Sequence, residues 1–353
     1  MITSIEIQGL RGIREGRIEG LAPLTILVGP NGCGKSTVLE AIGVASAGLS
    51  MGELFHALAS REWLGLAGLR YWFADGAARV STRFSMSVGN APAGALHKTS
   101  INIGEIGVGS PPGVDERGPI VSLSATLDDM GSRAWINADG LIFVMDGTPK
   151  APLPFVMQSA FVDRPAGATN RLSDPHFSSA LRDALTTIKL SPWYDELFSY
   201  LQILRPTLTS IESIAVGDRD EPHTFERDPK QGRVGYPLAY AGDGFRRSLL
   251  LAGTFARAKG GVAAIDEPEA FAHPGMFTPL TSLIRRAVAD GTQVVLSTHS
   301  LEFVAAALQA FEDQPEKAAV VGLRMESGVL DPLVVSDPDA HRRVLEFGHD
   351  LRL

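Results

Sequence analysis

The chain has 353 residues, of which 44% are hydrophobic and 20% are charged, and its formal net charge is −8 at pH 7. This composition is typical of a globular protein with a large core. The negative net charge does not favour nucleic-acid binding, which remains possible only through a local contact. No apolar run approaches the ~18 residues of a membrane helix, and the single cysteine, Cys33, excludes an internal disulfide. We therefore expect a cytoplasmic protein with no membrane partner.

The first predicted elements are strands at residues 2–8 and 24–28, the second of which leads into a glycine-rich turn and a helix at about 35–47. This is the order of a nucleotide-binding α/β unit. From residue 69 to 161 the spacing of apolar residues changes. Apolar and polar residues alternate in "RVSTRFSMSV", which predicts a half-buried strand. We expect this part to be antiparallel, with further strands near 120–127, 141–146 and 153–161.

Glycine and proline are dense between residues 89 and 119, which predicts a long loop without an element. Residues 175–205 predict two helices, with Pro192 between them, and strands follow near 210–216 and 234–239.

The last part of the chain alternates strictly between helices and strands. Because such alternation is typical of a parallel sheet covered by helices, we expect that architecture here. The predicted elements are helices at 244–258, 275–289 and 300–311, strands at 261–266 and 292–297, a strand pair at 318–324 and 328–335, and a last helix.

The sequence "GPNGCGKST" fits the phosphate-binding pattern G-x-x-x-x-G-K-[ST], after a buried strand and at a helix start. The glycines let backbone N–H groups turn toward a phosphate, and the helix dipole adds favourable potential. We expect Lys35 to bridge the β- and γ-phosphates, Ser36 to bind Mg²⁺ and Thr37 to reach the α-phosphate, so ATP and Mg²⁺ are the expected cofactors. The predicted nucleotide-binding residues of this loop are Gly29, Pro30, Asn31, Gly32, Cys33, Gly34, Lys35, Ser36 and Thr37.

A second motif, "GGVAAIDEPEAFAHP", is an apolar strand that ends in two carboxylates. Asp266 is expected in the Mg²⁺ shell, and Glu267 is expected to orient or deprotonate the attacking water; the alternative is a pair that caps the next helix. The next strand ends in "LSTHS", where His299 can reach a γ-phosphate. The predicted catalytic residues are Glu267, His299 and Lys35.

The motifs "GPNGCGKST", "GDGFRR", "IDEPEAFAHP" and "STHS" stand in the order found in ABC-type ATPases of the SMC and OLD (overcoming lysogenization defect) group, which the chain resembles from "IEIQGLRGI" to "DLRL". The resemblance implies an α/β fold, an ABC-type P-loop ATPase head with an antiparallel β-rich portion in the N-terminal lobe and a helical subdomain. The expected parts of this one split domain are an N-terminal lobe at 1–165, a helical subdomain at 166–208 and a C-terminal lobe at 209–353.

The resemblance also implies two further site residues. Arg11 in "GLRGI" matches an arginine that often touches nucleotide in this group, the alternative being an exposed turn residue. Gln158 in "LPFVMQSAFVDRP" stands in the right order for the glutamine that helps hold Mg²⁺, although a plain strand glutamine is an equal alternative.

The stretch "YAGDGFRRSL" occupies the position of the signature loop, which in this family contacts a nucleotide held by a second subunit. Gly242 stands where the family often has a serine, so its hydroxyl donor is missing. We expect a helix from about Gly244 with Asp243 as its N-cap. The helix N-terminus and Arg246 or Arg247 would then replace the lost donor, in a weak dimer.

These features predict an ATPase that forms a homodimer across ATP and works in DNA repair or in defence against phages and mobile elements through an effector or nuclease partner. The chain has no heptads for SMC-type coiled-coil arms, and we expect no Toprim nuclease after "STHS". Two alternatives stay open. One is an ATP-sensing scaffold that restrains a toxin or nuclease with little turnover; the less favoured one is a transporter nucleotide-binding subunit.

Overall fold

The computed structural model of the chain describes residues 1–47, 77–84, 96–103, 107–109, 118–127, 130–137, 142–145, 159–161, 175–216, 219–270 and 273–336. The helices of these residues are α1 (Lys35–Ala47), α3 (Pro175–Leu190), α4 (Tyr194–Leu204), α5 (Asp243–Arg257), α6 (Phe277–Ala289) and α7 (Leu301–Ala310), with short 3-10 turns η2 (Leu238–Tyr240), η3 (Pro274–Met276) and η4 (Pro315–Lys317).

Strands make up the rest of the regular structure. Those of the N-terminal part are β1 (Ile2–Leu10), β2 (Ile13–Glu19), β3 (Leu24–Val28), β4 (Ala77–Phe84), β5 (Leu96–Ile103), β6 (Gly107–Gly109), β7 (Gly118–Leu127), β8 (Met130–Asn137), β9 (Ile142–Met145) and β10 (Ser159–Phe161). The later strands are β11 (Leu208–Val216), β12 (Arg219–Asp228), β13 (Gly232–Pro237), β14 (Val262–Asp266), β15 (Gln293–Ser297), β16 (Ala318–Glu326) and β17 (Val329–Val335).

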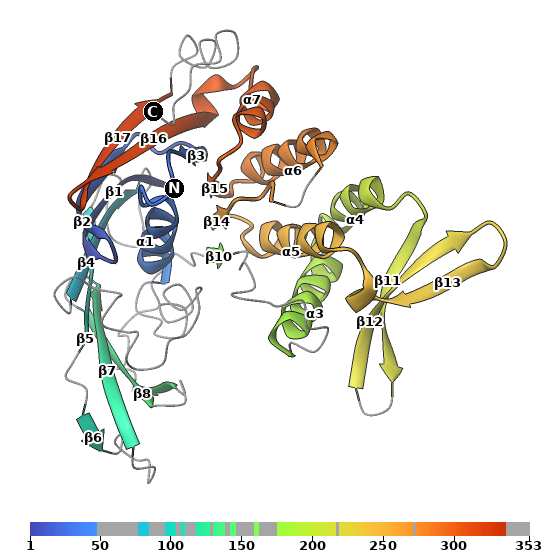
Figure 1. Cartoon of the computed structure of the whole chain (residues 1–353), viewed down its shortest axis with the longest axis horizontal. Helices are drawn as coiled ribbons and strands as arrows, with labels where there is room; N and C mark the ends of the chain where they lie inside the picture. Colours follow the sequence, from blue (N-terminus) through green and yellow to red (C-terminus); the bar gives the residue numbers. More distant parts are fainter. Residues whose placement is uncertain are drawn as a thin grey trace.

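Most of these strands belong to one large, curved sheet, whose order is β10-β14-β15-β3-β16-β17-β2-β1-β4-β5-β7-β8-β9, with β6 beside β7 (Figure 1). Its first five strands, from β10 to β16, pair in parallel. Beyond β2 every pairing is antiparallel. The sheet thus joins a parallel part, built largely from the C-terminal third, to an antiparallel part built from the N-terminal half.

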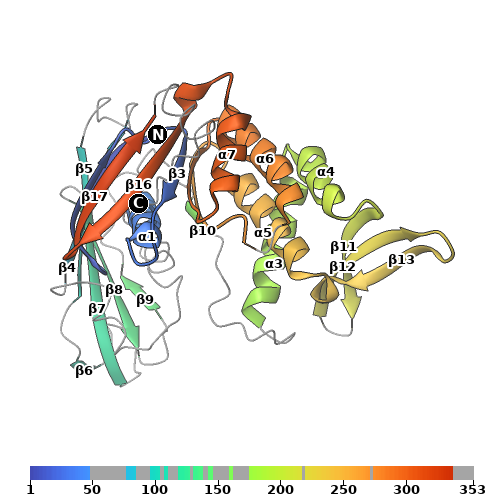
Figure 2. The same cartoon turned by 45° about the horizontal axis from the view of Figure 1, so that its top comes forward.

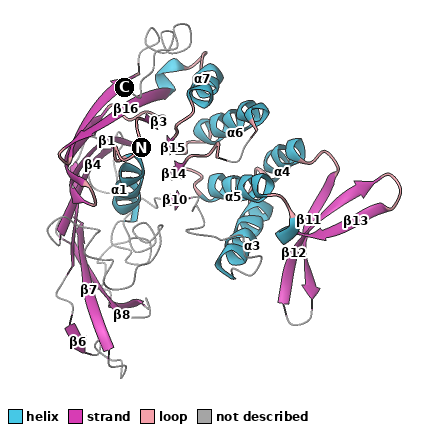
Figure 3. Ribbon diagram, viewed as in Figure 1, coloured by secondary structure: helices cyan, strands magenta, loops and turns pink. Residues whose placement is uncertain are grey.

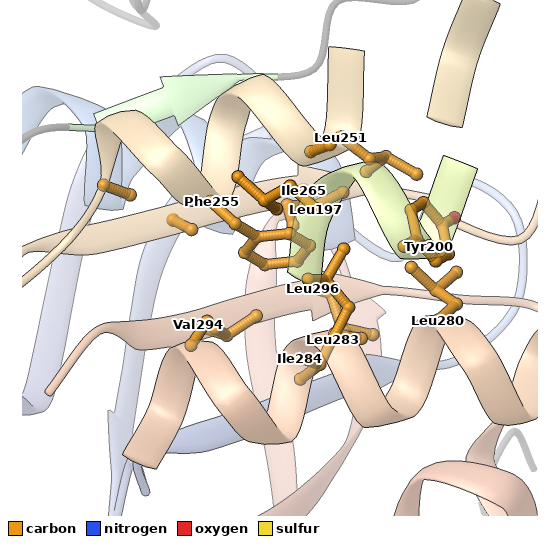
Figure 4. Packing of buried hydrophobic residues seen from close by; sticks show 14 of the residues in the cluster. Leu197, Tyr200, Leu251, Phe255, Ile265, Leu280, Leu283, Ile284, Val294 and Leu296 are labelled. Atoms are coloured by element: carbon orange, nitrogen blue, oxygen red, sulfur yellow. The ribbon is translucent and has the colours of Figure 1, made fainter. Parts of the chain in front are cut away.

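The hydrophobic core lies between the parallel strands and the helices α3 to α7. Phe255 of α5 and Ile284 of α6 are fully buried there, against Ile265 of β14 and Leu296 of β15 (Figure 4). Helix α1 lies on the inner side of the curved sheet, away from the other helices, as the colouring by secondary structure makes plain (Figure 3). Parallel strands covered by helices on both faces read as apolar runs, and all five residues of β3 and of β15 are buried.

A second sheet of three strands, β11-β12-β13, extends beyond α3 and α4 on the far side of the molecule from the large sheet (Figures 1 and 2). Leu208 and Ile211 of β11 connect this sheet to the hydrophobic core through their buried side chains. The helices of the described residues include none that is long and apolar enough to cross a membrane.

The strand and helix alternation expected for the last third is confirmed, and so is antiparallel pairing in the middle stretch for β4, β5, β7, β8 and β9. The expectation of a plain loop at 89–119 is wrong, since β5 and β6 lie within it. Strand pairing outweighs the glycine and proline content there, because β5 lies between β4 and β7. Strand β10, expected to be antiparallel, pairs in parallel with β14. Strand β12 was missed, since "RDEPHTFERD" is too polar to read as a strand. The expected last helix lies outside the described residues.

Candidate nucleotide site

The predicted phosphate-binding loop connects β3 to α1 and lies close to the neighbouring strand β16. Gly29 has φ 147°, and a Cβ atom there would lie 2.4 Å from the carbonyl oxygen of Leu323, so only glycine fits. The side chain of Lys35 is buried, and its Nζ donates to the carbonyl oxygens of Gly29 at 2.8 Å and Pro30 at 3.0 Å. The ammonium group is therefore held over the loop that the sequence assigns to phosphate.

The acidic strand end lies beside this loop because β14, β15 and β3 are adjacent parallel strands whose carboxyl ends meet at one edge. The register pairs Asp266 with Ser297, and Ser297 with Leu27. Ser36 Oγ donates to Asp266 Oδ2 at 3.1 Å, between residues 230 apart in sequence, and Ser297 donates to the other oxygen of the same carboxylate. The predicted metal-binding pair, Ser36 and Asp266, is thus brought together.

The predicted catalytic pair also meets at this edge. His299 Nε2 lies 3.7 Å from Glu267 Oε1, and their side chains are 37% and 23% exposed, so both reach solvent. Glu267 has a positive φ of 47°, and its backbone N–H donates to the carbonyl oxygen of Ser297 at 3.0 Å. A positive φ is rare for a residue with a side chain, and residues that adopt it cluster at functional sites.

A third carboxylate, Glu269, lies behind this pair and was not singled out by sequence reasoning. Its Oε1 accepts from Thr298 Oγ1 at 2.5 Å and from the backbone N–H of His299 at 3.4 Å. Burial raises the pKa of Glu269 above its ordinary value, hydrogen bonds lower it by less, and the nearby charge of Glu267 adds to the rise. The sequence does show Glu269 as the second glutamate of "DEPE", but the spacing of this motif does not predict which residues it would contact.

Arg11 and Gln158 have different outcomes. Arg11 has φ 49°, and its Nε donates to Glu40 of α1, whose side chain is buried. The arginine is thereby fixed to the helix that begins with Lys35, and its contact with nucleotide stays a prediction. Gln158 lies outside the described residues.

The signature stretch starts α5, but one residue earlier than expected. The helix begins at Asp243, so the N-cap position falls on Gly242 and the expected cap at Asp243 is wrong. The backbone of Asp243 is already helical, and its carboxylate accepts from the guanidinium of Arg246 one turn later. Arg247 is buried, which leaves Arg246 as the arginine that can reach a partner subunit, while Gly244 is half-buried in the first turn.

The residues at this edge suit nucleotide and magnesium. A hydroxyl and a carboxylate are the hard oxygen ligands that Mg²⁺ prefers, and it usually takes only one or two protein ligands along with phosphate oxygens and water. The described residues include no cluster of three or more His, Cys, Asp or Glu that could hold a metal by itself. The site therefore fits a metal ion that arrives with a nucleotide.

Comparison with known proteins agrees with this geometry. A family model described as "AAA domain" matches residues 4–53, and one described as "AAA domain, putative AbiEii toxin, Type IV TA system" matches residues 163–305. A solved structure, "Crystal structure of the SmcHead bound to the C-winged helix domain of ScpA", superimposes with a TM-score of 0.50 over 97% of this chain and 99% of that one, at 14% identity.

This chain has the fold of an SMC-like, ABC-type ATPase head. The expected fold class is confirmed, whereas membership of the OLD branch stays a prediction. Among curated relatives, the DNA double-strand break repair Rad50 ATPase of Methanopyrus kandleri is 37% identical over 76 residues, which are 22% of this chain and 9% of that protein. An uncharacterized protein of Methanocaldococcus jannaschii is 28% identical over 112 residues, which are 31% of this chain and 98% of that protein. The head thus spans a small part of the Rad50 relative's length.

Proposed function

We propose that the chain binds ATP with Mg²⁺, hydrolyses it, and forms a dimer of two heads across the bound nucleotide. The observation that carries the proposal is the hydrogen bond from Ser36 to Asp266. It unites the phosphate loop with the acidic strand end, next to which Glu267 and His299 face each other.

Each residue of this edge has a role in the proposed reaction. Lys35 binds phosphate oxygens in exchange for the carbonyl groups that it contacts here. Ser36 and Asp266 hold the metal ion, which, when bound, neutralises charge on the phosphates. Glu267 orients a water molecule and accepts its proton, and His299 donates a hydrogen bond toward the terminal phosphate.

The proposed dimer follows from the resemblance and from the exposure of the catalytic pair. Glu267 and His299 are partly exposed, so a second copy can cover them. The start of α5 would supply backbone N–H groups and Arg246 to the nucleotide of the other subunit. Nucleotide closes the dimer only if it binds the closed state more tightly than the open one.

We propose a role in DNA repair or in defence, exercised in the cytoplasm through a partner protein. The description of the family model that matches residues 163–305 names a putative toxin of a toxin–antitoxin system. The name of the Rad50 relative refers to double-strand break repair, and the matching SMC head was solved in complex with a domain of ScpA. Each of these is a property of that protein, and together they support a partnered head ATPase.

The test is the ATPase rate as a function of protein concentration, for the wild type and the variant Glu267→Gln. We expect a rate per subunit that rises with concentration, and an ATP-dependent dimer of Glu267→Gln in light scattering, because turnover is blocked while binding is kept. Lys35→Ala is the control that should neither bind nor dimerise. A rate per subunit independent of concentration, with no ATP-dependent dimer, would contradict the dimer. Binding with negligible turnover in the wild type would instead favour the ATP-sensing scaffold.

A further inference from the structure

We propose that Glu269 is a positioning residue, which holds His299 opposite Glu267 by tying the segment after β14 to the segment after β15. The inference deepens the proposed ATPase function and rests on it. Glu269 itself is not assigned a contact with nucleotide.

The two segments are joined at two points. Nearer the strands, the backbone N–H of Glu267 donates to the carbonyl oxygen of Ser297 at 3.0 Å and lies 3.3 Å from its hydroxyl. Farther along, Glu269 accepts from Thr298 Oγ1 and from the backbone N–H of His299. The backbone of His299 is therefore fixed from the same segment that carries Glu267.

Thr298 makes this second join rigid. Its side chain is fully buried, and its backbone N–H donates to the carbonyl oxygen of Leu27 at the end of β3. Its hydroxyl donates to Glu269 and accepts from the backbone N–H of Ser300, the N-cap residue of α7, at 3.0 Å. His299 thus lies between Thr298 and Ser300, and the Thr298 hydroxyl, which is bonded to Glu269, also accepts from Ser300.

A purely structural explanation accounts poorly for a glutamate here. Its second carboxylate oxygen, Oε2, is buried and has no hydrogen-bond partner within the described ranges. Such an orphaned oxygen destabilises a fold, and a nearby Glu267 of the same charge adds to the cost. A buried side chain that costs stability, yet fixes the backbone of a catalytic histidine, is what a positioning role predicts.

The test is a double-mutant cycle on ATP hydrolysis with Glu269→Ala and His299→Ala. We expect Glu269→Ala to lower kcat roughly 10-fold or more with little change in KM, because a displacement of about 1 Å can cost on the order of 100-fold. In the His299→Ala background, Glu269→Ala should cost nothing further, since both changes remove the same interaction. Equal losses in the two backgrounds, or an unchanged kcat, would overturn the inference.

Matched variants separate positioning from folding. Glu269→Gln keeps an acceptor for Thr298 and His299 and should restore most of the activity that Glu269→Ala loses. Thr298→Val removes the donor and should lower kcat in the same way, whereas Thr298→Ser keeps the hydroxyl and should not. This pair tests the link even where Glu269→Ala fails to fold. A wild type without ATP hydrolysis would overturn the proposed function together with this inference, while an active wild type with additive losses overturns the inference alone.

Discussion

Ser36, in the first turn of α1, donates a hydrogen bond to Asp266 at the end of β14, with 3.1 Å between Oγ and Oδ2. The two residues are 230 positions apart in the sequence and meet because β15 alone separates β3 from β14 in the sheet. The candidate site therefore depends on the parallel sheet, which brings the loop after β3 to the end of β14. Neither segment forms the site by itself.

Asp266→Asn should weaken ATP binding in the presence of Mg²⁺ but not in the presence of EDTA. The amide keeps the shape and an acceptor for Ser36 while removing the charge that a metal ion requires. We expect a loss of about ten-fold or more, the scale on which metal sites respond even to outer partners. The measurement is nucleotide titration by calorimetry, with Asp313→Asn, in an exposed pair with Arg285, as the control. Equal losses with and without Mg²⁺ would argue against a metal role.

Glu269→Gln should change how stability depends on pH. The pKa of Glu269 is raised in the folded chain, so its contribution to stability is fully present below its ordinary unfolded pKa and is lost as pH rises through the raised folded value. The glutamine variant lacks this loss, so the wild type should become less stable relative to it as pH rises above about 4.3. Urea unfolding of both proteins across the pH range measures the difference, with the exposed Glu312→Gln as the control. Parallel curves for wild type and Glu269→Gln would show that the carboxyl does not carry the effect.

Gly253→Ala should destabilise the fold, although alanine normally favours a helix over glycine by about 1 kcal/mol. A Cβ at Gly253 of α5 would lie 2.6 Å from the Cβ of Ala184 in α3. Overpacking of this kind typically costs about 1–3 kcal/mol. Denaturant unfolding measures it, and the double variant with Ala184→Gly should recover only part of the loss, because it removes the Cβ clash but leaves the Cα of residue 184 at 2.8 Å. A stabilised Gly253→Ala would mean that α3 and α5 separate without cost.

Arg246→Ala should weaken ATP-dependent dimerisation by about ten-fold for each of the two nucleotides in the dimer, so on the order of 100-fold in the dimer constant, because each lost contact is a hydrogen bond to a charged group. Asp243→Asn should act in the opposite direction, since it removes a negative charge near the incoming phosphates and releases the arginine. Sedimentation of the Glu267→Gln background with ATP gives the dimer constant, and the exposed Arg257→Ala on the same helix is the control. Identical dimer constants for Arg246→Ala and Arg257→Ala would mean that the start of α5 contacts the nucleotide of the other subunit through backbone N–H groups alone.

Sequence reasoning succeeded where the signal was local. The apolar run of β3, the helix at Lys35 and the repeated strand and helix alternation after Asp243 all follow from periodicity, and they fix the sheet edge at which the motifs meet. The pairing of Ser36 with Asp266 was anticipated from their motifs, because both follow parallel strands.

The features that the sequence did not predict depend mostly on pairing between segments that are distant in the chain. The polar strand β12 is held by its neighbours β11 and β13, and β5 by β4 and β7. The role of Glu269 depends on Thr298, which comes from the next strand along. The N-cap at Gly242 was missed because aspartate is the stronger cap on average, yet here Asp243 lies inside the helix and pairs with Arg246.

The position of β3 between β15 and β16 has a consequence for the synthesis of this protein. The strand that precedes the predicted phosphate loop is made well before both of its neighbours, which are encoded after residue 290. Until β15 has emerged both edges of β3 lack their partners, and until β16 has emerged one edge still does; unpaired strand edges are prone to aggregate. The sheet edge at which the predicted site lies can therefore form only after β15 and β16 have been made.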